Sequence, residues 1–301
     1  MATNSPSCDA VSVVITNFNT WPLTLQCVGA LHKLSGARLR EIVIVDDYSS
    51  TSAQGAFPPN VRLISNESNL GYVASVNVGV RSTNGAIIVL LDSDARPLVD
   101  VVSPCRDAFC VNPGLGALSF RTVDEAGSET GSSSPDPDVL DFVLGQKLSQ
   151  YRRRSASGTQ RRLYHSCALA FRRTAFEAVG GFDEDFDFLD ADLDFSVRLY
   201  EAGWAQQQDP GLLAIHSGGG SPQSTATRVL RFHRNRWRFL AKHNRLHLPV
   251  LVKISLMIRH AIEYAVLRLI GRSIMPLDVL QDKLAGRRAL LHSVMTGYGN
   301  E

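Results

Sequence analysis

The chain has 301 residues, a formal net charge of +2, 44% hydrophobic residues and 20% charged residues. This length can bury one large α/β core or two smaller ones, and the composition excludes disordered, collagen-like and coiled-coil proteins. The charge is uneven: residues 228–301 carry 14 lysines and arginines against 4 acids, and residues 1–227 carry 17 against 25. This split can mark an acidic, cation-binding body followed by a basic tail for anionic partners, or basic residues that only solvate helical faces.

The first 120 residues alternate apolar runs with amphipathic patterns. The runs are rich in Val, Ile and Leu and predict buried strands at 11–16, 41–46, 61–65, 86–91 and 114–120. Wider apolar spacing predicts helices at 23–34, 73–81 and 99–110. Strands alternating with helices predict an α/β fold with a doubly wound, mostly parallel sheet.

Regular patterns stop at residues 124–160, where Gly, Ser, Pro and charged residues predict one long mobile loop. A strand at 163–171, helices at 174–179 and 193–202, and a strand at 212–215 follow. Helical periodicity returns at 224–243 and 250–269. We therefore expect an α/β domain over 1–223 and a basic, amphipathic helical extension over 224–301.

Charged residues such as Lys253, Arg259 and Glu263 interrupt the last predicted helix and disfavour a membrane span. The extension would lie either on an anionic membrane surface or on the α/β body. The five cysteines lack a CxxC pair, which favours buried thiols over disulfides or zinc, and residues 1–9 lack a secretory pattern. We expect a cytoplasmic protein, with a peripheral position at the inner face of the membrane as the open alternative.

Acidic pairs follow two of the predicted strands. Asp46 and Asp47 end one strand, and Asp92 and Asp94 follow another, separated by Ser93. Because open α/β sheets bind ligands beyond the carboxyl ends of their strands, both pairs are expected on one edge of the sheet. Carboxylates two residues apart can hold a divalent cation, which can in turn hold a diphosphate.

A denser acidic group follows Gly180-Gly181-Phe182. Its seven members are Asp183, Glu184, Asp185, Asp187, Asp190, Asp192 and Asp194. Capping and the helix dipole account for two or three acids at a helix start. The others need a cation, a basic partner or a raised pKa to relieve their repulsion. Arg198, four residues after Asp194, is the expected ion-pair partner of that aspartate.

Seven short segments occur in a characteristic order, followed by His216. They are VVITNFN at 13–19, IVDDYSS at 44–50, NLGY at 69–72, NVG at 77–79, LDSD at 91–94, GFDEDF at 181–186 and DLDFSVR at 192–198. The set resembles family 2 glycosyltransferases of the GT-A fold, particularly the rhamnosyltransferase-like branch. The resemblance covers about residues 11–245.

The resemblance implies that residues 1–223 bind a nucleotide sugar and catalyse its transfer. The residues implied for nucleotide-sugar binding are Thr16, Asn19, Asp46, Asp47, Asn69, Gly71, Asn77, Asp92 and Ser93. Asp94 and His216, together with Asp92, are implied ligands of a Mg²⁺ or Mn²⁺ ion on the diphosphate.

Asp192 occupies the position of the family's general base, which implies a single inverting displacement at the anomeric carbon. Asp190, Asp194 and Phe182 are the candidates on the acceptor side. The family usually has Glu before the catalytic aspartate, whereas this chain has Ala191. That departure leaves open whether Asp190 has taken over a role, or whether the acceptor differs.

The implied function is metal-dependent transfer of a sugar from dTDP-rhamnose or a UDP-sugar in cell-surface polysaccharide biosynthesis. The acceptor would be a glycan, a lipid-linked intermediate or a small molecule. A sugar nucleotidyltransferase is an alternative, but it would want a basic, Gly-rich loop after the first strand, and residues 16–21 contain no basic residue. A non-catalytic carbohydrate-binding relative is a further alternative, and Ala191 is the only residue that favours it. Nucleic acid is not expected as a partner, because the basic tail has no DNA-binding motif.

Overall fold

The computed structural model describes residues 10–53, 57–154, 161–216 and 224–296. Its backbone contacts divide the chain into two compact units. The first takes residues up to 134, 162–185 and 191–221, and the second takes 135–161, 186–190 and those from 222 onward. The second unit thus combines the C-terminal helices with two segments from the middle of the chain.

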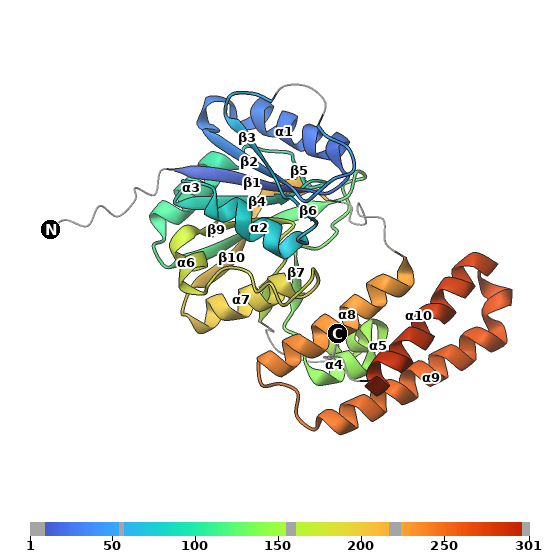
Figure 1. Ribbon diagram of the computed structural model, residues 1–301. Coiled ribbons are helices and arrows are strands. Elements are labelled where there is room, and N and C mark those ends of the chain that lie inside the picture. Colours follow the sequence, from blue (N-terminus) through green and yellow to red (C-terminus); the bar gives the residue numbers. More distant parts are fainter. Residues whose placement is uncertain (1–9, 54–56, 155–160, 217–223, 297–301) are drawn as a thin grey trace. The chain divides into compact units, whose positions relative to one another are not determined.

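An eight-stranded sheet forms the first unit (Figure 1), in the order β3-β2-β1-β4-β9-β6-β10-β5. The strands are β1 (Val11–Asn17), β2 (Glu41–Asp46), β3 (Val61–Ser65), β4 (Ile87–Asp92), β5 (Arg96–Pro97), β6 (Leu115–Val123), β9 (Ala168–Arg172) and β10 (Ala205–Ile215). Neighbours among β1 to β4 pair in parallel, as do β6 and β10. β9 runs antiparallel to β4 and β6, and β5 runs antiparallel to β10. The predicted mostly parallel sheet is confirmed.

One face of the sheet packs against α1 (Trp21–Ser35) and α3 (Val102–Val111). A short 3₁₀ turn, η1 (Gly36–Arg38), follows α1. Alternate strand residues such as Val13 and Ile44 meet Leu31 of α1 and Phe109 of α3 in a fully buried cluster. This alternation follows from the two-residue repeat of strands, which sends neighbouring side chains to opposite faces.

The other face is covered by α2 (Tyr72–Arg81), α6 (Arg173–Ala178) and α7 (Ala191–Glu201). Gly79 of α2 lies so close to the sheet that a Cβ there would come 2.5 Å from the Val14 side chain. Phe171 of β9 stacks with Phe176 of α6, their ring centroids 5.5 Å apart. Both faces of the sheet are therefore covered, as a doubly wound fold requires.

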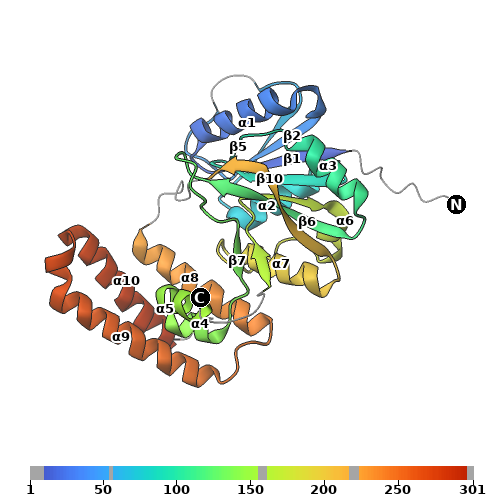
Figure 2. The ribbon, with the colours of Figure 1, turned by 180° about the vertical axis from the view of Figure 1, so that it is seen from behind.

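Two strands depart from the prediction. The stretch 163–171 forms two strands, β8 (Arg162–Tyr164) and β9, and β8 pairs with β7 (Ser133–Pro135) in a separate sheet. β10, seen in Figure 2, begins at Ala205 instead of residue 212, with register shifts along β6. Its first half is polar and partly exposed, so no apolar run marks it in the sequence.

The stretch 124–160, predicted to be a loop, is only partly so. It contains β7 and two helices of the second unit, α4 (Val139–Leu144) and α5 (Gln146–Arg154). A capping box starts α4, because Asp138 and Asp141 each accept a hydrogen bond from the other's backbone N–H. Arg152 of α5 then pairs with both carboxylates at 2.7 Å. Local capping and pairing thus order a stretch whose composition is that of a loop.

Three longer helices complete the second unit: α8 (Thr225–Lys242), α9 (Pro249–Ile274) and α10 (Leu277–Thr296). The third was not predicted. Gly271 of α9 lies against Leu280 of α10, and Gly286 of α10 lies against Ala226 of α8. These contacts leave no room for larger side chains at either glycine. No helix among the described residues is long and apolar enough to cross a membrane.

Cys27, Cys105 and Cys167 are buried free thiols, as expected. Cys110, near the end of α3, is disulfide-bonded, contrary to the expectation. The spacing of the cysteines contains no signal for this bond, because it depends on which segments the fold brings together.

Candidate active site

Three potential metal ligands converge where β4 and β10 end. Asp92 is the last residue of β4, Asp94 lies two residues further on, and His216 follows β10. One ligand atom of each residue lies within 4.8 Å of the others. His216 Nε2 lies 3.6 Å from Asp94 Oδ1 and 3.9 Å from Asp92 Oδ2. Two carboxylates and an imidazole form a donor set suited to Mn²⁺ or Mg²⁺.

The environment of Asp92 also fits a cation. Its Oδ1 atom is buried and has no hydrogen-bond partner among the described residues. Burial raises the pKa of Asp92 to about 6, and the charge of Asp94 adds to the rise, whereas His216 opposes it. A buried carboxylate oxygen without a donor is costly unless a positive charge meets it. These three residues therefore fit a divalent metal ion.

The backbone holds these ligands in place. The N–H of Asp92 donates to the carbonyl of Cys167 at 2.9 Å, and the N–H of His216 donates to the carbonyl of Val123 at 2.8 Å. Asp92 and His216 thus continue the hydrogen bonding of the sheet. Only the side chains beyond the strand ends are left to meet a ligand.

A polar network occupies the carboxyl ends of β1 and β2. The Asn17 amide donates to Asp46 Oδ1 at 2.6 Å and to Ser49 Oγ at 3.0 Å. Asn19 has a left-handed backbone with φ 58°, and its Oδ1 accepts from both the N–H and the hydroxyl of Ser50 at 2.8 Å. Thr16, the neighbour of Asn17 on β1, is buried. Thr16, Asn19 and Asp46 therefore lie together at the carboxyl ends of β1 and β2.

Asp47 supports the loop before α2. Its carboxylate accepts from the N–H of Leu70 at 2.8 Å, the N–H of Gly71 at 2.9 Å and the Asn66 amide at 2.9 Å. The Asn69 amide lies 3.5 Å from the Asp47 carbonyl. Gly71 has φ 87°, a conformation that favours glycine. Asp47, predicted to contact the nucleoside, thus directs its carboxylate to the backbone of residues 70 and 71.

Asn77 and Phe182, both predicted near the substrates, lie in the interior. The Asn77 amide donates to the Phe182 carbonyl and to Glu184 Oε1, each at 2.8 Å, and Asn77 Oδ1 accepts from the Phe182 N–H at 3.0 Å. The Phe182 ring stacks on Phe195, with centroids 4.3 Å apart. Asn77 is 1% exposed and Phe182 is 2% exposed. Their contacts join α2 to the segment before α7 and leave no surface for a substrate.

Asp192 lies in the first turn of α7, because this helix begins at Ala191, two residues earlier than predicted. Its Oδ1 accepts from the Leu193 N–H at 2.8 Å and its Oδ2 from the Ser166 N–H at 3.4 Å. The neighbouring Cys167 carbonyl accepts from Asp92, as described above. The 166–167 segment therefore contacts both the predicted base and the predicted metal ligands.

Arginines engage four other acids of the dense group, among them Glu184, which lies 3.9 Å from Arg81. Asp194 is fully buried and accepts from Arg198 Nε at 2.7 Å, which confirms the predicted pair. Asp190, in the second unit, accepts from Arg236 Nε at 2.7 Å and Nη2 at 2.9 Å. Asp187 pairs with Arg231 at 3.3 Å. Basic partners thus relieve much of the repulsion that the sequence implied.

Ser93, a predicted site residue, accepts a hydrogen bond from the Thr20 hydroxyl at 2.8 Å. Other polar residues of this edge were not predicted from the sequence. The Tyr72 hydroxyl lies 3.0 Å from Ser166 Oγ. Asn17 and Tyr72 lie within the resembling segments and could have been identified there. Ser166 carries no sequence signal, because only strand pairing brings it to this edge.

The fold is that of the GT-A glycosyltransferases. A mannosyltransferase from Pyrobaculum calidifontis, solved with GDP-Man and Mn²⁺, has a TM-score of 0.56 at 17% identity, over 95% of this chain and 86% of its own. GalNAc-T7, solved with UDP, GalNAc and Mn²⁺, has a TM-score of 0.55 at 16% identity over 75% of this chain. This chain spans about half of that second structure, 47% of its length.

The family follows from the sequence match. The model of glycosyl transferase family 2 matches residues 12–180, so the chain belongs to this family and is a glycosyltransferase. It is 26% identical over 261 residues to N-acetylglucosaminyl-diphospho-decaprenol L-rhamnosyltransferase of Mycobacterium tuberculosis, covering 77% of this chain and 84% of that protein. The expected rhamnosyltransferase-like family 2 assignment is confirmed, and it decides against a sugar nucleotidyltransferase.

Proposed function

We propose that this protein transfers a sugar from a nucleotide-sugar donor to a hydroxyl group, with inversion at the anomeric carbon. The convergence of Asp92, Asp94 and His216 within 4.8 Å carries the proposal. A divalent cation held by these residues would neutralise the charge on the donor diphosphate. Similar folds crystallised with Mn²⁺ support this assignment.

Asp192 is the proposed general base. Its carboxylate takes the proton of the acceptor hydroxyl while that oxygen forms a bond to the anomeric carbon. The bond from this carbon to the diphosphate breaks, and its electron pair leaves with the nucleotide diphosphate. The N–H groups of Ser166 and Leu193 hold the carboxylate. The position of Asp192 at the start of the DLDFSVR segment, 192–198, matches that of the family's general base.

The edge formed by β1 and β2 is the proposed nucleoside site. Thr16, Asn19 and Asp46 lie there with Asn17, whose amide links the two strands. Asp47, Asn69 and Gly71 would shape the neighbouring loop, and Ser93 lies beside Thr20 at the same edge. These groups offer both donors and acceptors, as recognition of a base and a ribose requires.

For the donor we propose a dTDP-rhamnose-like nucleotide, with a UDP-sugar as the second candidate. For the acceptor we propose a lipid-linked saccharide, with a free glycan or a small molecule as alternatives. The support is the similarity to an L-rhamnosyltransferase whose name specifies a diphospho-decaprenol acceptor. Such an acceptor would bring the protein to a membrane surface.

The test is a panel of nucleotide sugars, scored by release of nucleotide diphosphate with Mn²⁺, with Mg²⁺ and with EDTA. We expect one donor to be turned over selectively in the presence of metal. Proton NMR of the product then reports the anomeric configuration. Retention of configuration, or turnover that EDTA leaves unchanged, would contradict the proposed mechanism.

A further inference from the structure

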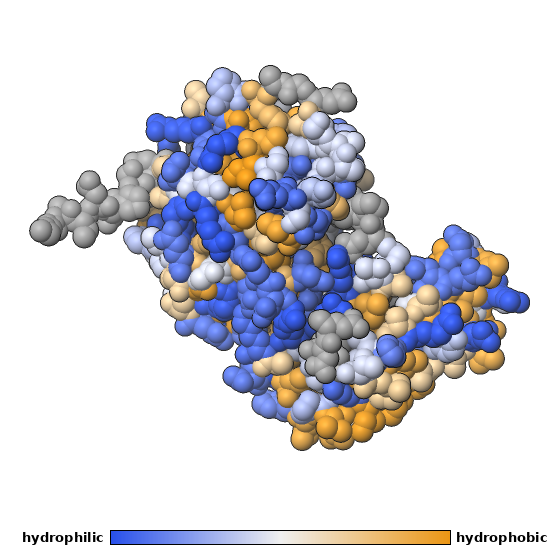
Figure 3. All heavy atoms as spheres, in the orientation of Figure 1, coloured by the Kyte–Doolittle hydropathy of each residue, from blue (hydrophilic) through white to orange (hydrophobic). Residues whose placement is uncertain are grey.

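The outer face of α9 is apolar along most of its length. The exposed residues on it are Val250, Leu251, Ile254, Ile258, Ala261, Ile262, Ala265, Val266 and Leu269. Their spacing of mostly three or four residues places them on one side of the helix. Ile258 is 56% exposed and Leu269 is 82% exposed. Figure 3 shows hydrophobic side chains gathered over this helix.

The opposite face of α9 is buried and combines apolar side chains with the polar group around Glu263 and His260. Val252 is 5% exposed and Leu256 is fully buried. A water-exposed helix face normally carries polar residues along its length. Among the described residues, the inner face of α9 is covered, whereas the centre of its outer face is exposed and apolar.

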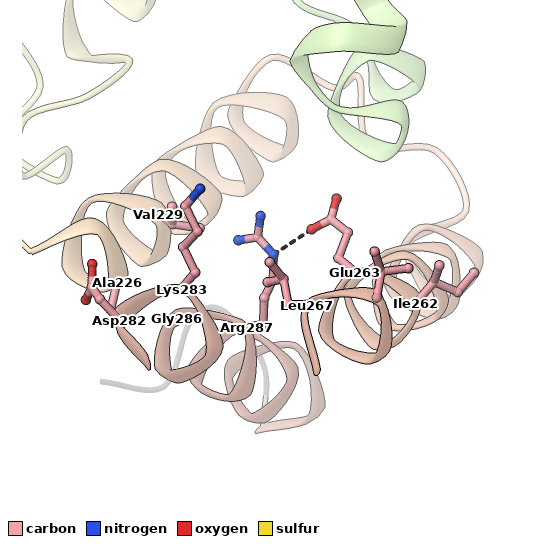
Figure 4. A pocket seen from close by; sticks show the side chains of 10 residues that line it. Ala226, Val229, Ile262, Glu263, Leu267, Asp282, Lys283, Gly286 and Arg287 are labelled. Atoms are coloured by element: carbon pink, nitrogen blue, oxygen red, sulfur yellow. Dashed lines mark ion pairs between the residues drawn. The ribbon is translucent and has the colours of Figure 1, made fainter. Parts of the chain in front are cut away.

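The charges of α9 are segregated. Its one acid, Glu263, points inward and pairs with Arg259 at 2.9 Å. It also pairs with Arg287 of α10 at 2.5 Å (Figure 4). Arg268 and Arg272, both exposed, lie toward the C-terminal end of the outer face. Lys253 lies near the other end and is half-buried. The outer face therefore combines an acid-free apolar centre with positive charge toward its C-terminal end.

The apolar surface extends beyond α9 into a pocket of about 330 Å³ between α8, α9 and α10 (Figure 4). Ile262 and Val266 of the outer face line this pocket together with Val229 of α8. Lys283, which is exposed, also lines it, next to the partly buried Asp282. The uncovered apolar surface is therefore wider than a single helix face.

Three arginines of α8, the other basic helix, have partners within the second unit. Arg231 and Arg236 pair with Asp187 and Asp190. The Arg238 guanidinium lies 6.0 Å from the centre of the Phe186 ring. These contacts hold part of the basic row of α8 within the unit, whereas the apolar centre of the outer face of α9 is exposed.

We propose that the outer face of α9 docks onto an anionic lipid bilayer. The helix would lie parallel to the surface, with its isoleucines at the acyl boundary and Arg268 and Arg272 among the headgroups. The charges disfavour a second copy of the chain. A parallel pair of these faces would bring Arg272 against Arg272, and an antiparallel pair would bring Arg268 and Arg272 toward Lys253. Anionic headgroups neutralise all of these cations.

The test is co-sedimentation of the full chain with vesicles of phosphatidylcholine, alone or mixed with phosphatidylglycerol. We expect binding to the mixed vesicles, weaker binding to the neutral ones, and further weakening in salt. Ile254→Glu/Ile258→Glu should lower the partition about tenfold or more per substitution, because each removes apolar burial and adds a negative charge. Val111→Glu, at an 84% exposed position on α3, is the matched control and should bind as wild type does.

Arg268→Glu/Arg272→Glu keeps the isoleucines and should lose only the preference for anionic vesicles. Far-UV circular dichroism checks that each variant folds. Absence of wild-type binding to either vesicle, or unchanged binding of Ile254→Glu/Ile258→Glu, would overturn the proposal. Equal binding to both kinds of vesicle would overturn the proposed preference for anionic lipid. A wild-type dimer in analytical ultracentrifugation that this isoleucine variant dissociates would assign the face to a second copy instead. None of these readouts depends on the metal site, so the proposed transferase function stands or falls separately.

Discussion

Asp190, Asp192 and Asp194 are spaced two residues apart, yet their carboxylates have different partners. Arg236 engages Asp190 and Arg198 engages Asp194, whereas the carboxylate of Asp192 accepts from the backbone N–H groups of Ser166 and Leu193. Backbone N–H groups can hold a carboxylate in a fixed orientation. The three residues therefore offer a matched series of substitutions.

Asp192→Asn should lower kcat by about 10²–10⁴-fold while donor affinity stays near that of wild type, because only the general base is lost. Asp190→Asn and Asp194→Asn should instead lower the free energy of unfolding, by about 1–3 kcal/mol each, because each leaves a part-buried arginine with a weaker partner. Initial rates, calorimetric donor binding and urea denaturation separate the two effects. Near wild-type turnover in Asp192→Asn together with an inactive Asp190→Asn would show that Asp190 is the base.

Asp94→Asn should raise the metal concentration needed for half-maximal activity by about tenfold or more, because an amide oxygen is a weaker ligand than a carboxylate. Activity is measured across a Mn²⁺ titration in metal-depleted buffer. Asp107→Asn, an exposed acid on α3, is the control and should leave the titration unchanged. Full activity of the wild type in excess EDTA would remove the metal from the mechanism.

At the scale of single elements, the loop before α2 depends on one side chain. The two oxygens of Asp47 receive the N–H groups of Leu70 and Gly71 and the amide of Asn66. Asp47→Ala removes all of these acceptors and should destabilise the protein by about 1–3 kcal/mol. Hydrogen exchange at residues 70 and 71 should accelerate more than exchange in the core strands. Unchanged protection there would show that the loop is held by other contacts.

Three helices of the second unit meet at another ion-pair cluster, around Glu263 of α9. Burial alone would raise the pKa of Glu263, but the His260 hydrogen bond and the Arg259 and Arg287 charges outweigh it and lower this pKa to about 2. His233 and His260 are buried with their rings 4.7 Å apart, and burial lowers the pKa of each. In the folded protein both imidazoles therefore stay neutral to a lower pH than in the unfolded chain.

Acid should destabilise this cluster in two stages. Below the unfolded histidine pKa of 6.5, the unfolded chain takes up protons that folded His233 and His260 resist. The contribution of Glu263 is complete above its unfolded pKa of 4.5 and is lost as the pH falls toward about 2. Glu263→Gln should therefore be less stable than wild type at pH 7, by about 1–3 kcal/mol.

The difference between Glu263→Gln and wild type should shrink as the pH falls below 4.5 toward 2. Urea denaturation at several pH values measures it. Glu67→Gln, at an exposed position after β3, should show no comparable difference. A gap between Glu263→Gln and wild type that stays constant down to pH 2 would contradict the lowered pKa.

Across the whole molecule, the charge asymmetry of the sequence is partly resolved within the second unit. Acids from the middle of the chain pair with the basic tail, as Asp136 does with Arg245 and Asp190 with Arg236. The basic residues in these ion pairs therefore stabilise the second unit. For Arg268 and Arg272 of α9, the described part of the chain shows no such acid.

Ligand binding should be visible in global stability. At 100 times its Kd, a nucleotide diphosphate with Mn²⁺ should stabilise the folded state by about 2.7 kcal/mol, which raises Tm by roughly 4 °C in a protein of this size. Differential scanning fluorimetry with UDP and dTDP measures the shift. EDTA or His216→Ala should remove most of it. A shift that persists undiminished in both would separate nucleotide binding from the metal site.

The sequence by itself determined the parallel core, β1 to β4 with α1 to α3. Apolar runs and amphipathic spacing are local signals, and in these elements burial agrees with them. It also determined the Asp194–Arg198 pair, because a spacing of four residues on a helix is sufficient to bring the two side chains together. The acidic pairs at the strand ends followed from the general placement of ligands in such sheets.

Only the tertiary structure decided how these residues are used. Strand pairing brings His216 to Asp94 and Ser166 to Asp192, and it commits Asp47 to a loop and Asn77 to the interior. The tertiary structure also assembles the second unit from three segments that are separate in the sequence. No local pattern encodes such contacts, because they depend on which strands become neighbours and in which register, and those choices depend on packing over the whole sheet.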